Sequence, residues 1–350
     1  MIDIKKSSLS LIFIFLVFGC IEPNTEDLWN ITIESVLGTD GYVRDVHVEN
    51  NLAFLAAGEA GAQIWDLSNG FQKIQSFSLD DIGSDKEITQ VHYSSLNKLM
   101  QLLEYNERAY IMTLDDSLYN IESSWGQWGA EDTRGFVISD SAEQFTYYSV
   151  IKKDHFLKWG KWEYLHEYGG YWSRSSVEGE SAEIDIYATP TSIALSNKKL
   201  IIGIGQLGVQ IWELSDINSN PLFQASIDLD GSVESITLVD ENSLFIAKGS
   251  YGASFIPLDQ IEIDIETNSI INNIPIAKFA EDLNVNHIAV NNNIAALSLG
   301  SKGIALYDIT DYSSPIEKGI YPIGYSYKAQ FWGEKLLVCT REGLQIISIN

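Results

Sequence analysis

Gly61-Ala62-Gln63-Ile64-Trp65-Asp66-Leu67 is the stretch that decides the fold, because copies of it return along the chain. Residues 208–214 read Gly-Val-Gln-Ile-Trp-Glu-Leu, and residues 303–309 read Gly-Ile-Ala-Leu-Tyr-Asp-Ile. Weaker copies begin at Gly252, Gly343, Arg108 and Lys153. The seven first positions, 61, 108, 153, 208, 252, 303 and 343, are separated by 47, 45, 55, 44, 51 and 40 residues. A period of about 40–50 residues is typical of the blades of a β-propeller.

A second pattern precedes each copy: an apolar strand, a polar turn and another apolar strand. In the first blade it reads Val43 to Val48, then Glu49-Asn50-Asn51, then Leu52 to Ala56, and it returns near residues 193, 233 and 285. Alternating or continuous apolar residues separated by polar turns predict strands and hairpins. No sustained helical period follows residue 30. We therefore predict seven all-β blades, near residues 43–80, 88–120, 135–175, 191–228, 233–275, 285–322 and 327–350.

These repeats resemble the LVIVD repeat family, whose units are propeller blades, over residues 32–350. The resemblance is strong in blades one, four and six, poor in blades two and three, and implies little about a ligand. The last copy ends after a third strand, while residues 31–36 form an apolar strand that belongs to no copy. Pairing this N-terminal strand with the last blade removes exposed strand edges. We predict a seven-bladed β-propeller whose ring is closed by residues 31–36.

The first twenty residues resemble a lipoprotein signal peptide. Lys5 and Lys6 precede a ten-residue apolar stretch, and Gly19 stands directly before Cys20. The resemblance implies cleavage after Gly19 and a diacylglyceryl group on the Cys20 sulfur, with residues 20–30 as a tether. The apolar stretch is about half the ~20 residues of a membrane-spanning helix. We therefore expect an exported chain held at the cell membrane or outer membrane by lipid, with Cys339 as a buried, unpaired thiol.

The chain is strongly acidic, with 48 acidic and 22 basic residues and a formal net charge of −26. This charge repels phosphate, so nucleic acid is not an expected partner. Cations, basic proteins and glycans stay open, and the charge also fits a surface that resists aggregation. We expect a monomer.

Several motifs suggest ligands that their context does not support. Residues 203–208 match the dinucleotide pattern G-x-G-x-x-G, but a strand follows where that mechanism needs a helix. The glycines recur in other blades, so we interpret them as turns. His47 and His92 occupy equivalent places in adjacent blades, with His287 offset by one place; packed histidines are the preferred interpretation over a metal pair. Residues 228–231 lack calcium-loop spacing. We predict neither metal nor cofactor.

An aromatic cluster follows the predicted third strand of blade three and includes Trp159, Trp162 and Trp172. Exposed aromatic side chains stack on sugars or anchor proteins. The alternative is that these rings cover a blade whose own repeat has decayed.

Two functions remain open. The first is a propeller that binds a protein or glycan through the turns between second and third strands, with candidate contact residues Glu59, Tyr105, Gln206, Tyr251, Lys302 and Arg341. Loops on a rigid scaffold can vary without unfolding it. The second is an extracellular hydrolase or lyase of a polymer, which would need carboxylates at the channel mouth with pKa values pushed apart. No catalytic signature is present, and no catalytic residue is assigned.

Overall fold

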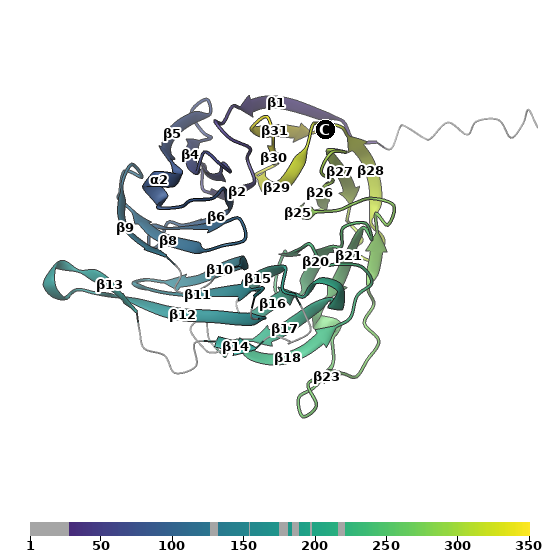
Figure 1. Cartoon of the computed structure of the whole chain (residues 1–350). Coiled ribbons are helices and arrows are strands. Elements are labelled where there is room, and N and C mark those ends of the chain that lie inside the picture. The colour runs from purple at the N-terminus through teal and green to yellow at the C-terminus, as the bar shows by residue number, and fades with distance from the viewer. Residues whose placement is uncertain are drawn as a thin grey trace, which may run out of the picture.

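The structure is a computed structural model that describes residues 28–126, 132–153, 155–174, 181–183, 189–196, 198–215 and 221–350. Seven antiparallel sheets surround a central axis (Figure 1), which confirms the predicted seven-bladed β-propeller. In each of the first six blades the chain runs from the axis outward, and in the seventh the outermost strand comes from the N-terminus. Signal peptide, Cys20 and most of the tether lie outside the described residues.

The strands of the blades, from the axis outward, have the following bounds. Blades one to three are β2 (Asp45–Glu49), β3 (Leu52–Ala56), β4 (Ala62–Asp66) and β5 (Gln72–Phe77); β6 (Ile88–Ser94), β7 (Leu99–Glu104), β8 (Ala109–Leu114) and β9 (Ile121–Gly126); and β10 (Thr133–Ser141), β11 (Gln144–Ile151), β12 (Phe156–Leu165) and β13 (Tyr171–Arg174), with β14 (Ser181–Glu183) also on β12. Blades four and five are β15 (Ser192–Ser196), β16 (Lys199–Gly203), β17 (Val209–Glu213) and β18 (Leu222–Ile227); and β19 (Ser235–Leu238), β20 (Ser243–Ala247), β21 (Ala253–Pro257) and β24 (Ala277–Phe279). Blades six and seven are β25 (His287–Asn291), β26 (Ile294–Ser298), β27 (Ile304–Asp308) and β28 (Ile316–Tyr321); and β29 (Ser326–Trp332), β30 (Lys335–Thr340), β31 (Leu344–Ile349) and β1 (Ile31–Leu37).

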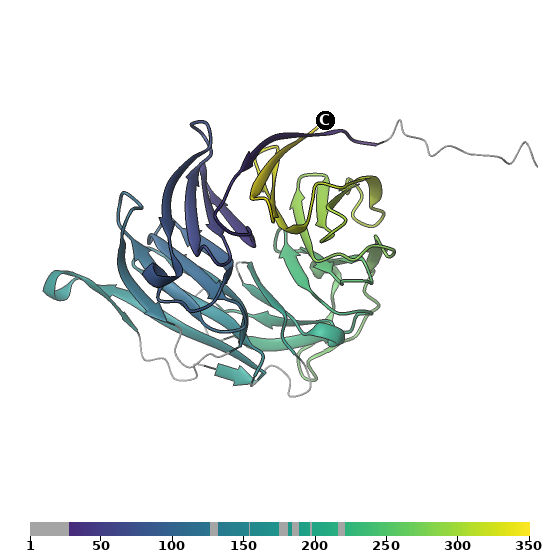
Figure 2. The same cartoon turned by 45° about the horizontal axis from the view of Figure 1, so that its top comes forward.

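The N-terminal strand closes the ring. β1 pairs antiparallel with β31, from Ile31 opposite Ile349 to Leu37 opposite Leu344. Figure 2 shows the purple strand lying along the yellow C-terminal strands. Asn30 and Asn350 exchange two backbone hydrogen bonds, of 3.0 and 2.8 Å, at the end of the ladder. The predicted closure is therefore confirmed.

The hydrophobic cores lie between adjacent blades. One cluster joins Phe54 and Ile64 of blade one to Met100 and Met112 of blade two, and a similar cluster joins blade seven to blade one. The repeated Gln-x-Trp unit contributes its own buried bond, because Trp65 Nε1 donates to Gln63 Oε1 at 3.1 Å and Trp212 Nε1 to Gln210 Oε1 at 3.3 Å. Blades one and four therefore share a buried side-chain hydrogen bond as well as the same strand geometry.

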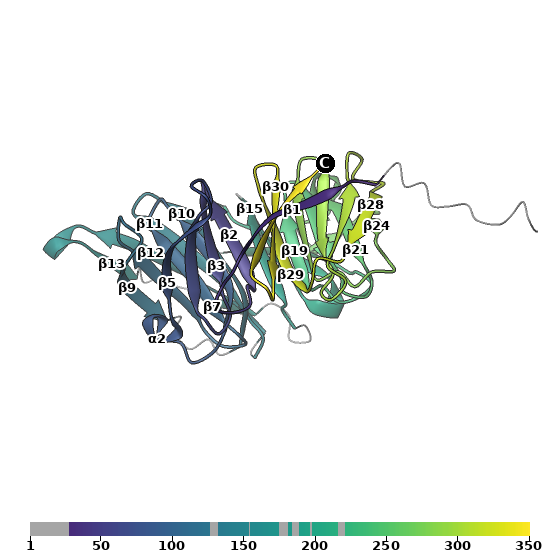
Figure 3. The ribbon, with the colours of Figure 1, turned by 90° about the horizontal axis from the view of Figure 1, so that it is seen from above.

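Blade three departs from the pattern. Its strands β10, β11 and β12 have 9, 8 and 10 residues, whereas the first three strands of blade one have 5 each. The β12–β13 hairpin projects from the rim of the ring (Figure 3). The remaining elements are short: α2 (Leu79–Ile82), the β22 (Ile263–Asp264) and β23 (Ser269–Ile270) pair, and 3-10 turns at Glu167–Gly169, Gly205–Leu207 and Leu258–Gln260. No helix among the described residues has the length and apolar character that crossing a membrane requires.

Candidate functional site

The turns between second and third strands gather on one face, which we call the turn face (residues 58–61, 105–108, 205–208, 249–252, 300–303 and 341–343). Backbone bonds hold each turn to the next blade. Gly58 N donates to Ile88 O at 3.1 Å and Ile88 N to Gly58 O at 3.0 Å, and Gly249 and Val285 repeat the exchange at 2.9 and 2.8 Å. The turns are thus fixed by the ring itself, while their side chains can vary.

Glycine is required at the end of the blade-four turn. Gly208 has φ of 85°, and a Cβ there would lie 2.0 Å from the Ile227 carbonyl oxygen. Gly205, three residues earlier, has φ of 59° and no contact closer than 3.3 Å. The G-x-G-x-x-G match is therefore a turn between β16 and β17, as the repeat predicts, and no helix follows it.

All six predicted contact residues are exposed on the turn face, at three different positions of the turn. Tyr105 replaces the first glycine of its turn, Glu59 and Gln206 follow that glycine, and Tyr251 and Lys302 precede the last one. Arg341 begins the shorter turn of blade seven, where its guanidinium lies 4.3 Å from the centre of the Tyr325 ring. Their placement on one face agrees with the sequence-based hypothesis. A contact role for them stays a prediction.

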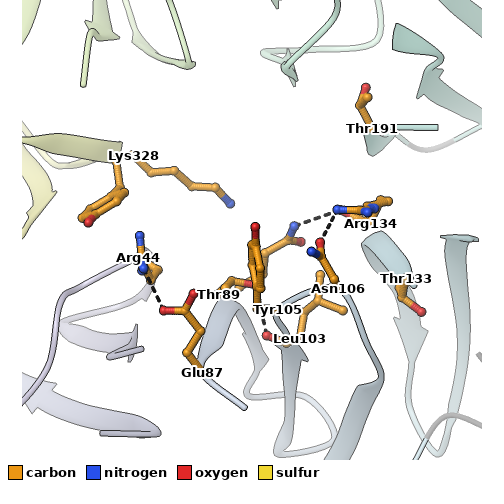
Figure 4. A pocket seen from close by; sticks show the side chains of 12 residues that line it. Arg44, Glu87, Thr89, Leu103, Tyr105, Asn106, Thr133, Arg134, Thr191 and Lys328 are labelled. Atoms are coloured by element: carbon orange, nitrogen blue, oxygen red, sulfur yellow. Dashed lines mark hydrogen bonds and ion pairs between the residues drawn. The ribbon is translucent and has the colours of Figure 1, made fainter. Parts of the chain in front are cut away.

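A pocket of about 420 Å³ lies at the mouth of the channel on this face. We call it the mouth pocket. Its walls come from the starts of inner strands, from turns and from the end of β7, in blades one, two, three, four and seven (Figure 4). The lining residues are Arg44, Glu87, Thr89, Gln90, Leu103, Tyr105, Asn106, Thr133, Arg134, Thr191, Tyr327 and Lys328. Of the predicted contact residues, Tyr105 lines it. The three cationic residues were not singled out from the sequence.

Each cation at the mouth has an acidic neighbour. Arg44 donates to Glu87 at 2.7 Å, and the Arg44 guanidinium lies 4.4 Å from the centre of the Tyr327 ring. Lys328 Nζ donates to Asp45 Oδ2 at 2.9 Å, although the two residues are 283 positions apart. Arg134 pairs with Asp132 at 2.6 Å and also donates to Asn106. The mouth therefore offers fixed, charged N–H donors rather than a pair of free carboxylates.

A second pocket on the turn face lies between blades four, five and six and includes Gln206 and Tyr251 in its lining. Asp230 and Lys248 also line it, and Asp230 accepts hydrogen bonds from Lys248 Nζ and Lys278 Nζ, both at 2.8 Å. These two bonds lower the pKa of Asp230 to about 2, and the bond from Lys248 has the larger effect. Residues 228–231 therefore form an ion-paired turn. Among the described residues no group of three His, Cys, Asp or Glu side chains could hold a metal ion.

His47 and His92 lie side by side in the channel, with ring centres 4.2 Å apart, as their equivalent places in β2 and β6 predict. The predicted offset of His287 by one place is wrong. His287 pairs with Ser298 as Asp45 pairs with Ala56, so it lies two residues earlier, on the same channel-facing side as His47. Desolvation lowers the pKa of His47 to about 4 and that of His92 and His287 to about 3, with a further contribution from His47 at His92 and from Lys328 at His287.

We expect the free energy of unfolding to fall on mild acidification. The unfolded histidines titrate near pH 6.5 and the folded ones near 3–4, so the unfolded chain binds more protons between these values. Stability is then full above pH 6.5 and declines as the pH falls toward 4. At pH 5 the loss is about 1–2 kcal/mol per histidine. Urea unfolding at pH 7 and 5 measures it. His47→Gln with His92→Gln should flatten the slope; equal slopes in the natural protein and in this variant would contradict the assignment.

The aromatic cluster of blade three is largely part of the core. Trp159 and Trp162 are 5% and 9% exposed and lie within the third strand itself, so the prediction that they follow it is wrong. The longer β12 draws them into the blade, where Trp162 stacks on Phe145. Trp172 on β13 is half-buried and packs edge-on against Phe145 at 5.0 Å. Burial favours the alternative that these rings cover an irregular blade. Trp172 also lines a groove with Tyr171 and Tyr164.

Cys339 is fully buried, as predicted, and burial raises the pKa of its thiol. Cys20 is outside the described residues, so its lipidation stays a prediction.

Seven blades, closed by a strand from the N-terminus, define this chain as a seven-bladed β-propeller. Its fold is similar to that of the U3-55K structure (TM-score 0.63, 13% identity, 91% of this chain and 98% of that chain) and of the RRP9 WD40 repeats (TM-score 0.63, 13% identity, 92% and 98%). The WD40 β-propeller domain of Doa1 aligns at TM-score 0.61 and 12% identity over 91% and 97%. At these identities the similarity shows the fold alone. No family model and no curated protein matches the chain, and the LVIVD resemblance stays a prediction.

Proposed function

We propose that this chain is an exported lipoprotein whose propeller binds a protein or glycan through the turn face. The observation that carries the proposal is the contrast within each turn: backbone bonds and glycines fix the main chain, while exposed side chains of different chemistry stand on it. Tyr105 and Tyr251 are 53% and 54% exposed there. Exposed aromatic side chains on a rigid scaffold bury much area at little entropic cost when a partner binds.

The lining of the mouth pocket supports binding over the hydrolase or lyase alternative. Glu87 is the carboxylate in that lining, and it is engaged by Arg44. Asp45, just below, is engaged by Lys328. An acid and base pair needs two carboxylates whose environments push their pKa values apart. Glu87 and Asp45 are instead each held by a cation.

The anchor is proposed from residues 1–20, since the apolar stretch ends at the Gly19-Cys20 pair. Two acyl chains give stable membrane attachment where one is marginal. Metabolic labelling with a fatty-acid probe should mark the natural chain and leave Cys20→Ser unmarked. Equal labelling of both proteins would refute the anchor and leave the binding proposal standing.

A photo-crosslinking residue at position 59, 105 or 302, introduced in the producing cell, should capture a partner. The same residue at positions 51 and 242, which are exposed in turns after the first strands of their blades, is the control. Adducts from the control positions alone would contradict binding by the turn face.

A further inference from the structure

Some polar groups that line the mouth pocket have no hydrogen-bond partner in the protein. Arg44 Nε, Arg134 Nε and Thr191 Oγ1 are buried and have no hydrogen-bond partner among the described residues. The side chains of all three line this one pocket. Lys328 adds an ammonium, whose bond to Asp45 uses one of its N–H groups. Buried polar groups are normally paired with protein, water or a ligand, so these three groups are available to a ligand that enters the pocket.

The donors suit a carboxylate. A guanidinium presents its N–H groups in a planar fork that matches the two oxygens of a carboxylate. Arg44 and Arg134 lie on opposite walls of the pocket, and Lys328 extends toward the space between them (Figure 4). Glu87 holds Arg44, and Asp132 and Asn106 hold Arg134. The chain as a whole carries a charge of −26, which repels a polyanion at long range. A ligand with one carboxylate and no other charge fits the guanidinium N–H groups and is repelled less by the acidic chain than a polyanion.

The rest of the lining suits a sugar ring. Hydroxyl and amide side chains predominate, namely Thr89, Gln90, Asn106, Thr133 and Thr191, and the aromatic rings are Tyr105 and Tyr327. Leu103 is the one aliphatic residue in this lining, whereas sites for peptides usually offer apolar pockets to anchor side chains. The volume of about 420 Å³ falls in the range of small-molecule sites.

We propose that the mouth pocket binds a sugar acid, that is, a pyranose that carries a single carboxylate. Arg44, Arg134 and Lys328 bind the carboxylate, Thr191 and the amides bind ring hydroxyls, and Tyr105 packs on the ring. This inference rests on the proposed function and deepens it, because it names the ligand class taken by one part of the turn face.

The test compares D-glucuronate with D-glucose, which lacks the carboxylate, by calorimetric titration of the full-length chain. Glucuronate should bind at least tenfold more tightly. Tyr105→Ala, at an exposed position, and Arg134→Lys, which keeps the charge and loses the fork, should each weaken glucuronate at least tenfold. Tyr119→Ala is the matched control, since that tyrosine is 52% exposed and lies between β8 and β9, outside the turn face, and it should leave the affinity unchanged.

Four results would overturn the sugar-acid inference. Equal affinity for both sugars removes the carboxylate from recognition, and unchanged affinity in Tyr105→Ala places the ligand elsewhere. Binding of acetyl-trialanine, through its terminal carboxylate, in place of glucuronate would make the pocket a peptide site. If glucuronate does not bind, but Tyr105→Ala still weakens binding of the captured partner, the sugar-acid inference is wrong and the proposed function stands. If glucuronate binds as expected but the captured partner is unaffected by turn-face substitutions, the wider proposal fails instead.

Discussion

Asp230→Asn is expected to lower the free energy of unfolding by about 3–5 kcal/mol, because it leaves the buried Lys248 ammonium without its carboxylate. The Lys248 side chain is 1% exposed, whereas Asp230 and Lys278 are 41% and 45% exposed. The cost therefore comes from an uncompensated buried charge rather than from the exposed part of the network. Urea unfolding of the two proteins at pH 7 measures the difference.

Lys248→Met is the matched control for this prediction. It removes the buried charge and keeps a side chain of similar length, while Asp230 retains its 2.8 Å bond to Lys278. Replacing a buried ionic group by an apolar one of similar volume is often nearly neutral, so we expect a change within about 1 kcal/mol. A loss as large as that of Asp230→Asn in this variant would show that the ion pair itself stabilises the fold. The Asp230 contribution is present above its unfolded pKa near 3.8 and is lost as the pH falls toward 2.

Deleting residues 28–36 is expected to lower the melting temperature by roughly 10 °C or more, on the scale of 2–4 °C per kcal/mol for a large domain. The deletion removes most of the strand that pairs with β31 and the partly buried Trp29 and Ile31, which pack against the core between blades six and seven. Each such side chain contributes about 1–2 kcal/mol when partly buried. The exposed β31 edge should also promote aggregation. Differential scanning calorimetry with light scattering measures both effects.

Adding a synthetic peptide of residues 28–38 to the truncated chain distinguishes strand pairing from a general effect of truncation. If β1 acts by completing the seventh blade, the melting temperature should rise as the peptide concentration rises, with the logarithm of the concentration once this exceeds the Kd. A melting curve that is the same with and without residues 28–36 would contradict the closure of the ring.

The repeat predicted the blades because each copy depends on residues that are close together in the sequence. Gly58 and Gly61 meet a conformational demand that returns wherever a second strand turns into a third, with φ of 58° and 82° here and 60° and 83° at Gly300 and Gly303. The same regularity placed His47 beside His92. The closure could be predicted by counting strands, because the seventh repeat lacks an outer strand and residues 31–36 form a strand that belongs to no repeat.

The mouth pocket could not be predicted in the same way. Its cations lie in three blades, and the pairing of Lys328 with Asp45 joins segments 283 residues apart through a ring that no local pattern describes. Blade three was misread for a related reason: its strands lengthen, so Trp159 and Trp162 enter β12 where a blade of ordinary length would already have turned. A signal for the pocket does exist in the inner strands, where Lys328 interrupts a mostly apolar and aromatic run, Tyr325 to Trp332.

The most direct test of binding by the turn face is the affinity of the captured partner for a fourfold variant. Tyr105→Ala, Tyr251→Ala, Lys302→Glu and Arg341→Glu change exposed positions, so each should alter stability by no more than about half a kcal/mol. Titrated by calorimetry, the fourfold variant is predicted to bind the partner at least tenfold more weakly than the natural chain, a difference of about 1.4 kcal/mol. Unchanged affinity in the fourfold variant, together with loss of binding in Tyr171→Ala and Trp172→Ala, would contradict the account and place the contact surface on the projecting hairpin of blade three.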